Sequence, residues 1–375
     1  MSIREDWVTT EKWLLRQANS MGELLEQIRP YISSRLIDGQ GWERLLECAG
    51  ESPVTMAAFP FGFEIPLHDP RPKADFGVSL VGDSRTAAFF QERNRSGDAG
   101  PMAAGLAWLL DETDQEDSLL RRVIGRKMLL EYDVDLAPHS TRQAPGIFLY
   151  PVGDALVGDG RRFQDLGAVY DALVFASGWS PDAAERKHLE QVYRTLTPDT
   201  CIKAIGTFPS RERLVRIAIT GFRKARDVVA FLERAGWPGQ RSIVEDTVSF
   251  FEKRVAFAYL GVHFDVRASG VGPTMGLSFF AREQEWLKDI RHWTALIDGL
   301  REQGCALSEK LSELANWSTG STTLLGKSGP FMLVRGIHHI KLVISEDRVE
   351  QAKAYVFFLM MCGRPKGGIA ARETS

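Results

Sequence analysis

Cysteine is scarce in this sequence, and long apolar runs do not occur in it. The four cysteines, Cys48, Cys201, Cys305 and Cys362, lie far apart and form no CxxC pair. This spacing favours neither a zinc module nor a disulfide framework, so we predict reduced thiols buried in the core. No apolar segment reaches the roughly 18 residues that a membrane-spanning helix requires, so no membrane partner is expected.

Charge of one sign is not in excess either. The chain has 46 Lys and Arg residues against 49 Asp and Glu residues, a formal net charge of −3. Without a basic field over the whole molecule, nucleic acid is not an expected partner. Residues 1–16 are rich in charge and lack the apolar core of a secretory signal, which predicts a cytoplasmic protein.

The rest of the composition is that of an ordinary globular protein. Apolar residues make up 44% of the 375 residues and charged residues 25%, enough for a sizeable core. The length exceeds a usual domain of about 100 to 200 residues, so one large domain and two domains are both compatible with it. We interpret residues 1–375 as a single repeat-built domain with an N-terminal helical segment over about residues 1–50, where apolar residues recur at helical intervals.

One order of elements, helix, strand, turn, strand and helix, recurs along the chain. The periodicity predicts one copy with helices at 182–196 and 224–235 around strands at 201–208 and 214–222. It predicts the next with helices at 244–255 and 285–303 around strands at 258–267 and 274–281. Gly236 and Gly304 follow the last helix of each copy, where glycine commonly ends a helix.

Less complete copies lie on either side of these two. Strands are predicted at 56–67 and 74–81, followed by helical spacing at 86–93 and 102–110. A helix at 308–316 precedes strands at 337–345 and 351–358. The acidic run at 111–117 is interpreted as a solvated connection, and residues 146–175 as either a further hairpin or a long connection.

This order of elements indicates the fold class. Hairpins separated by helical pairs do not suit a parallel βαβ sheet, whereas an antiparallel sheet with helices on one side accommodates them. A sheet of eight to ten strands tends to curl, and closing it removes its edges. We therefore predict an α+β fold in which repeated αββα units form an antiparallel β-barrel of about ten strands, surrounded by a ring of helices.

One face of the predicted strands is unexpectedly polar. Because side chains alternate between the two faces of a strand, the following residues share that face: Glu64, Asp75, Lys203, Arg216, His263, Asp265, Arg267, His339, Lys341, Lys353 and Tyr355. The face is either the wet side of an open sheet or the interior of a closed barrel. On one strand Asp265 is placed to hold Arg267 or to orient His263.

A metal site is not expected among these residues. His338 and His339 are adjacent, and neighbouring residues on a regular strand point to opposite faces, so the pair is not placed to bind one metal ion. No motif for a cofactor stands out, and none is predicted.

The last predicted hairpin carries a resemblance to a known family. Its second strand, Gln351-Ala-Lys353-Ala-Tyr355-Val-Phe-Phe, is similar to the Lys-x-Tyr strands of aromatic prenyltransferases of the dimethylallyltryptophan synthase type. The resemblance implies αββα repeats around a ten-stranded barrel. It also implies that Glu64, in Phe-Glu-Ile-Pro, contacts the aromatic acceptor and takes its proton. Where the family has an arginine on the partner strand, this chain has Asp75, with Lys73 nearby.

The resemblance also implies a function. It implies metal-independent transfer of a prenyl group from an allylic diphosphate to an aromatic small molecule or a peptide side chain, in natural-product biosynthesis. The substrate-binding residues it implies are Lys203, Arg216, His263, Arg267, His339, Lys341, Lys353 and Tyr355. Cations would hold the leaving group, and aromatic faces would shelter the allyl cation.

Two alternatives to this function stay open. The same barrel could bind a small molecule or a peptide without transferring a prenyl group, because a fold can be reused while its site is replaced. A repeat-built interaction protein with an open sheet is the other alternative, and it would leave the polar strand faces in water.

Overall fold

The computed structural model describes residues 7–50, 52–96, 101–134, 144–153, 155–158, 162–281, 291–317, 319–326 and 329–361. The chain begins with α1 (Trp7–Gln17), α2 (Met21–Ile28) and α3 (Gly39–Ala49), followed by the 3₁₀ turn η2 (Val54–Ala58). Side-chain oxygens of Ser20 and Asp38 accept the first free N–H groups of α2 and α3, which explains where these helices begin.

Five αββα units follow one another along the chain. Their strand pairs are β1 (Phe61–Pro66) with β2 (Asp75–Val81), β3 (Lys127–Tyr132) with β4 (Gly146–Leu149), β5 (Cys201–Thr207) with β6 (Val215–Phe222), β7 (Tyr259–Arg267) with β8 (Gly270–Phe280), and β10 (Gly329–Ser345) with β11 (Arg348–Met361). The helices between them are α4 (Arg85–Arg95), α5 (Pro101–Asp114), α6 (Leu119–Ile124), α7 (Phe163–Ala176), α8 (Ala183–Arg194), α9 (Ala225–Ala235), α10 (Arg241–Glu252), α12 (Arg291–Glu302) and α13 (Ser308–Trp317).

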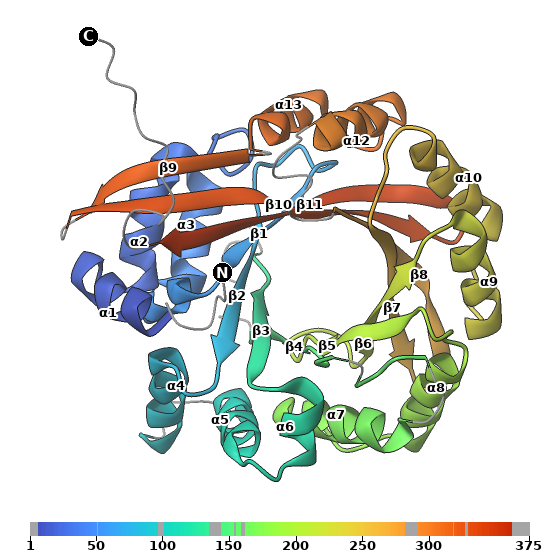
Figure 1. Cartoon of the computed structure of the whole chain (residues 1–375), viewed down its shortest axis with the longest axis horizontal. Coiled ribbons are helices and arrows are strands. Elements are labelled where there is room, and N and C mark those ends of the chain that lie inside the picture. The colour runs from blue at the N-terminus through green and yellow to red at the C-terminus, as the bar shows by residue number, and fades with distance from the viewer. Residues whose placement is uncertain are drawn as a thin grey trace.

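The ten strands close into an antiparallel barrel. Each of β1 to β7 pairs with the next strand, β8 pairs with β10, β10 pairs with β11, and β11 returns to β1. In the closing pair, Glu64 lies opposite Tyr355 and Pro66 lies opposite Lys353. Figure 1 shows the helices as a ring around the barrel. The predicted barrel is confirmed, and the open-sheet alternative is wrong.

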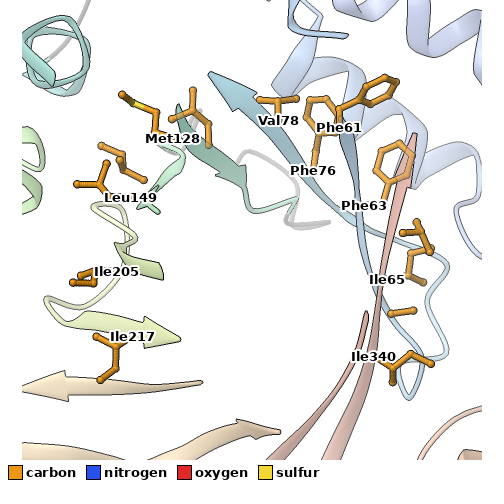
Figure 2. Close-up of a cluster of buried hydrophobic side chains, with 14 of the residues drawn as sticks. Phe61, Phe63, Ile65, Phe76, Val78, Met128, Leu149, Ile205, Ile217 and Ile340 are labelled. Atoms are coloured by element: carbon orange, nitrogen blue, oxygen red, sulfur yellow. The ribbon is translucent and has the colours of Figure 1, made fainter. Parts of the chain in front are cut away.

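The hydrophobic core lies between the barrel wall and the helices. Alternate residues of each strand, such as Phe61, Phe63 and Ile65 of β1, are buried on this outward side. Figure 2 shows members of this layer from β1 to β6 and from β10. Every second strand residue therefore packs against the helices, and the residues between them face the interior of the barrel.

Several predicted elements differ from those observed. The strand β3 was not predicted, and it forms the second strand pair with β4, while 163–176 form α7. The strand predicted at 56–67 starts later, because residues 54–58 form η2. The acidic run is not a simple connection, since α5 extends to Asp114.

The C-terminal region also differs from the prediction. The strand β9 (Thr319–Gly326) was not predicted, and β10 begins at Gly329 rather than at 337. Among the described strands, β9 pairs only with β10 and lies outside the ring of ten (Figure 1). Gly236 and Gly304 do follow helices, with φ angles of 75° and 64° that favour glycine.

The cysteine prediction was wrong in one respect. Cys48, Cys201 and Cys305 are present as thiols, as expected, but these residues are half-buried rather than buried in the core. Cys362 lies outside the described residues. In the described part of the chain, no helix combines the length and the hydropathy needed to cross a membrane.

Candidate functional site

The candidate site is centred on Glu64, whose carboxylate faces the barrel interior from β1. The residue is 7% exposed. The ammonium of Lys353 on β11 donates to Oε1 of Glu64 at 2.5 Å, and the ammonium of Lys341 on β10 lies 3.7 Å from Oε2. Lys341 also donates to the hydroxyl of Tyr355, and its ammonium lies 4.5 Å from the centre of the Tyr355 ring.

Strand register brings these four groups together. Glu64 is the direct cross-strand partner of Tyr355, and Lys341 is the direct partner of Lys353. Side chains at directly opposite positions of an antiparallel pair lie close enough to interact. The Lys-x-Tyr spacing on β11 therefore places both of its side chains on the inward face, next to Glu64.

The charges around Glu64 determine its ionisation. Burial alone would raise the pKa of Glu64, but the charges of Lys341 and Lys353, together with hydrogen bonds from Lys353 and Tyr355, hold that pKa well below its usual range. Burial lowers the pKa of Lys341 to about 8, although Glu64 opposes this shift. The carboxylate of Glu64 is therefore ionised at neutral pH.

Two further carboxyl groups face the interior beside Glu64. Asp75 lies opposite Glu64 on β2, and one of its oxygens accepts the N–H of Val134 at 2.8 Å. Burial, and then the charge of Glu64, raises the pKa of Asp75 to about 6 and that of Glu131 on β3 to about 8. No hydrogen bond or ion pair reaches Glu131 from the described residues.

The wall beside Glu131 is formed by glycine on both neighbouring strands. Its cross-strand partners are Gly77 on β2 and Gly146 on β4. A Cβ atom added to Gly77 would meet only Leu129, at 3.9 Å. A Cβ atom added to Gly146 would lie 2.7 Å from the ring of Phe208, so only the Gly77 side leaves room for a ligand group beside the Glu131 carboxyl group.

Arg216 and Asp265 form a second charged pair on the inward face. Nε and a terminal nitrogen of Arg216 donate to the two carboxylate oxygens of Asp265, at 2.8 and 3.0 Å. The sequence expectation that Asp265 holds Arg267 or orients His263 is therefore wrong, because cross-strand pairing places Asp265 opposite Arg216. Arg267 instead donates to Glu212 at 3.0 Å and does not join the cluster.

Two lysines lie at one end of the barrel. Since β3 and β5 run in the same direction, Lys127 and Lys203 lie near the same end, and Lys203 sits at an irregularity in its strand pairing. Burial, and then the charge of Lys203, lowers the pKa of Lys127. Within the described ranges, neither ammonium has a carboxylate partner. Two unpaired positive charges close together favour an anion.

Aromatic rings line the wall next to the charged cluster. The ring of His339 stacks on Tyr355 at 4.1 Å and on Phe280 at 4.8 Å between centroids, and Phe280 stacks on Tyr259 at 4.9 Å. His263 contacts the hydroxyl of Ser278 through Nε2 at 3.0 Å. Burial, with Lys341 and Arg216 nearby, lowers the pKa of His263 to about 3, so the ring is neutral.

The paired histidines do not point to opposite faces as predicted. The pairing of β10 with β11 shifts between Ile337 and His339, which leaves His338 as the extra residue of a bulge. The Nδ1 atoms of His338 and His339 consequently lie 2.8 Å apart. Over the described residues, no group of three or more His, Cys, Asp or Glu side chains could hold a metal ion.

The structure thus brings together most of the predicted site residues. Glu64, Arg216, His263, His339, Lys341, Lys353 and Tyr355 share the interior, whereas Lys203 lies toward one end and Arg267 is paired elsewhere. Sequence reasoning missed Lys127 and Glu131, because β3 and β4 were not identified as a strand pair. The alternation in Lys-Met-Leu-Leu-Glu-Tyr at 127–132 was the available signal.

Comparison with solved structures establishes the fold. The chain is similar to a 6-dimethylallyltryptophan synthase from Micromonospora olivasterospora, with a TM-score of 0.50 and 13% identity over 91% of this chain and 97% of the other. Another 6-dimethylallyl tryptophan synthase matches with a TM-score of 0.50 and 14% identity over 90% and 97% of the two chains. The chain therefore has the αββα barrel fold of these prenyltransferases.

The two comparisons by sequence add no evidence about the family or the function. No protein-family model matches the chain, and no curated protein matches it. At 13% and 14% identity the structural likeness concerns the fold, and the function depends on the residues of the site.

Proposed function

We propose that this chain transfers a prenyl group from an allylic diphosphate to an aromatic acceptor inside its barrel. One observation carries the proposal: the ionised carboxylate of Glu64, held by two lysines and a tyrosine, lies on the inward face of a closed ten-stranded barrel lined with aromatic rings. The Micromonospora enzyme of the same fold is described in complex with DMASPP and Trp, which supports both substrate classes.

The diphosphate binds at the end of the barrel that carries Lys127 and Lys203. A diphosphate brings several negative charges, and unpaired ammonium groups neutralise it without a bound metal ion. Lys353 and Lys341 share the single negative charge of Glu64, and Arg216 is neutralised by Asp265, so these cations are less available to a diphosphate. They orient the acceptor-binding carboxylate instead.

The acceptor binds against Glu64. Its ionised carboxylate accepts a hydrogen bond from an N–H or O–H of the acceptor, which is an aromatic small molecule or a peptide side chain. The allylic C–O bond breaks, the diphosphate leaves with the electron pair, and the acceptor carbon or nitrogen attacks the allyl cation. The wall of stacked aromatic rings beside the site, from Tyr355 to Tyr259, supplies the electron-rich surroundings that stabilise this cation.

The alternative is a barrel that binds a ligand without transferring a prenyl group. It is favoured by Asp75 and Glu131, which add two carboxyl groups to the interior where an anionic substrate would need cations. With a pKa of about 8, Glu131 is mostly neutral at physiological pH, whereas Asp75, with a pKa of about 6, is mostly ionised. Their charge therefore weakens the binding of a diphosphate without excluding it.

Calorimetric titration with dimethylallyl and geranyl diphosphate, in buffer with EDTA and then with magnesium, tests the proposal. A Lys127→Ala, Lys203→Ala double variant is expected to lose at least tenfold in affinity, that is about 1.4 kcal/mol. A Lys341→Ala, Lys353→Ala variant should lose less. The matched control is Lys224→Ala, Lys253→Ala, which removes two exposed charges at helix ends outside the barrel.

The outcomes separate the two functions. Micromolar binding that depends on Lys127 and Lys203, followed by prenylated product from tryptophan, tyrosine or histidine peptides, supports the transferase. If neither diphosphate binds the wild type, the transferase proposal is abandoned and the binding barrel is retained. If only the Lys341, Lys353 variant loses binding, the diphosphate lies beside Glu64 and our placement is wrong.

A further inference from the structure

The buried ring of His339 has an unused nitrogen. The residue is 7% exposed, and its Nε2 atom is buried and has no hydrogen-bond partner among the described residues. A buried polar atom without a partner is rare in folded proteins and costs folding free energy, so it calls for a functional explanation. The position on β10 between Phe280 and Tyr355 places the ring on the inward wall.

Three contacts fix the orientation of this ring. Tyr355 and Phe280 stack on its two faces, with interplanar angles of 12° and 24°. Its Nδ1 atom lies 2.8 Å from Nδ1 of His338, so one of these two atoms donates and the other accepts. With both faces and one nitrogen occupied, only Nε2 is left to contact a bound molecule.

The second ring of the pair reaches solvent. His338 is exposed, whereas His339 is buried, and the β-bulge turns the two rings toward each other. A hydrogen-bonded pair with one buried and one exposed imidazole is a path by which a proton can leave a closed site. Burial holds the pKa of His339 well below its usual range. The charges of His338, His263 and Lys341 lower this pKa further, and the charge of Glu64 opposes the shift. The ring is therefore neutral at rest.

We propose that His339 and His338 form the route by which the proton released from the acceptor leaves the barrel; this rests on the proposed prenyl transfer. The X–H bond of the prenylated acceptor breaks and its electron pair restores aromaticity. The proton bonds to Nε2 of His339, the Nδ1 proton of His339 moves to Nδ1 of His338, and Nε2 of His338 releases its proton to water. Tautomer exchange of both rings restores the resting state.

A weak base is sufficient for this step. The prenylated ring is a cation before it loses its proton and is far more acidic than an imidazolium, so even a ring with a low pKa accepts that proton. Glu64 is less suited to the role, because its carboxylate is already held by Lys353 at 2.5 Å and by Tyr355. In this assignment Glu64 binds the acceptor, and His339 is the catalytic residue that removes the proton.

The resting tautomer can be tested without any substrate. Nitrogen-15 NMR of histidine-labelled wild type, assigned with His338→Gln and His339→Gln, should show His339 protonated at Nδ1 and unprotonated at Nε2. That tautomer should persist from about pH 5 to 8, since the ring stays neutral in that range. A proton found on Nε2 would overturn the proposal, because that atom could not then accept another.

The reaction itself supplies the second test. With dimethylallyl diphosphate and tryptophan deuterated on its indole ring, wild type should show no isotope effect on kcat, since the deprotonation is fast. In His339→Gln this step should slow by about 10²-fold and the isotope effect should appear, with imidazole rescuing His339→Ala. His338→Gln should show a smaller isotope effect and unchanged substrate affinity.

These results separate failure of the relay from failure of the transferase. Wild-type turnover together with a His339→Gln variant that shows no isotope effect would overturn the relay alone. Absence of turnover with every acceptor tried would overturn the prenyl transfer on which it rests. Thermal unfolding shows whether His339→Gln is folded. If it is not, imidazole rescue of His339→Ala and the tautomer of His339 in the wild type still test the relay.

Discussion

Lys353 and Glu64 join the last strand of the barrel to the first, with 2.5 Å between the ammonium nitrogen and the carboxylate oxygen. The side chain of Glu64 is 8% exposed and that of Lys353 is 23% exposed, so water screens the pair only in part. The contact therefore combines two roles. It fixes the charge state of the candidate site, and it ties together strands that are 289 residues apart in the sequence.

Removing Lys353 should destabilise the fold through Glu64. Lys353→Met leaves a buried carboxylate with Lys341 alone, and breaking a buried ion pair on one side costs about 3 kcal/mol. The double variant Lys353→Met, Glu64→Gln removes both charges and should recover to within about 1 kcal/mol of wild type. Urea unfolding at pH 7 measures both. A single variant as stable as wild type would mean that the pair contributes no net stability.

Glu131 should make the fold less stable as pH rises. The pKa of this carboxyl group is raised from 4.5 to about 8 in the folded protein, so between these values the folded state holds a proton that the unfolded state has lost. The free energy of unfolding then falls by about 1.4 kcal/mol for each pH unit, and the fall ends near the folded pKa. Glu131→Gln should lack this fall and exceed wild type in stability at pH 8.

Asp75 provides the matched control for Glu131. Its pKa is raised from 3.8 to about 6, so Asp75→Asn should remove only the lower part of the same decline. Urea unfolding of the three proteins between about pH 4 and 9 separates these contributions. If Glu131→Gln follows the wild-type curve throughout, the carboxyl group is hydrated and its pKa is not raised.

Much of the fold could be predicted because the periodicity of single segments agrees with the repeated order of elements along the chain. The hairpins at 201–222 and 258–281 alternate regularly and are bounded by helices that end at Gly236 and Gly304, so their order revealed the repeat. The hairpin of β3 and β4 was missed because β4 has only four residues and the segment between the strands contains no short turn signal. Short strands carry too few residues to show a period of two.

The site was predicted less completely than the fold. Period two correctly placed Glu64, Lys341, Lys353 and Tyr355 on one face, but it cannot say which strand lies beside which. The pairing of Arg216 with Asp265, and the meeting of the first and last strands, follow from strand order and barrel closure. The bulge at His338 breaks the period, so the contact between His338 and His339 had no signal in the sequence.

Gly276 should be required for the position of Lys341. A Cβ atom added at Gly276 would lie 2.8 Å from Cδ of Lys341 and 3.4 Å from Cβ of His263. In Gly276→Ala the lysine has to move away from Glu64, so the pKa of Glu64 should rise and acceptor binding should weaken. Gly77→Ala is the control, since its Cβ would meet only Leu129 at 3.9 Å. Carboxyl-carbon NMR titration of both variants checks the pKa, and equal values would contradict the steric argument.

Lys203 should contribute to ligand binding while adding nothing to stability. Its ammonium lowers the pKa of Lys127, so the two charges repel each other in the folded protein. Lys203→Ala should therefore leave the free energy of unfolding unchanged or raise it by about 0.5 kcal/mol, within the range of surface substitutions. Dimethylallyl diphosphate should raise the melting temperature of wild type more than that of the variant, and salt should reduce the difference. A variant that loses stability and keeps the same ligand-induced shift would show that Lys203 is structural and that the diphosphate binds elsewhere.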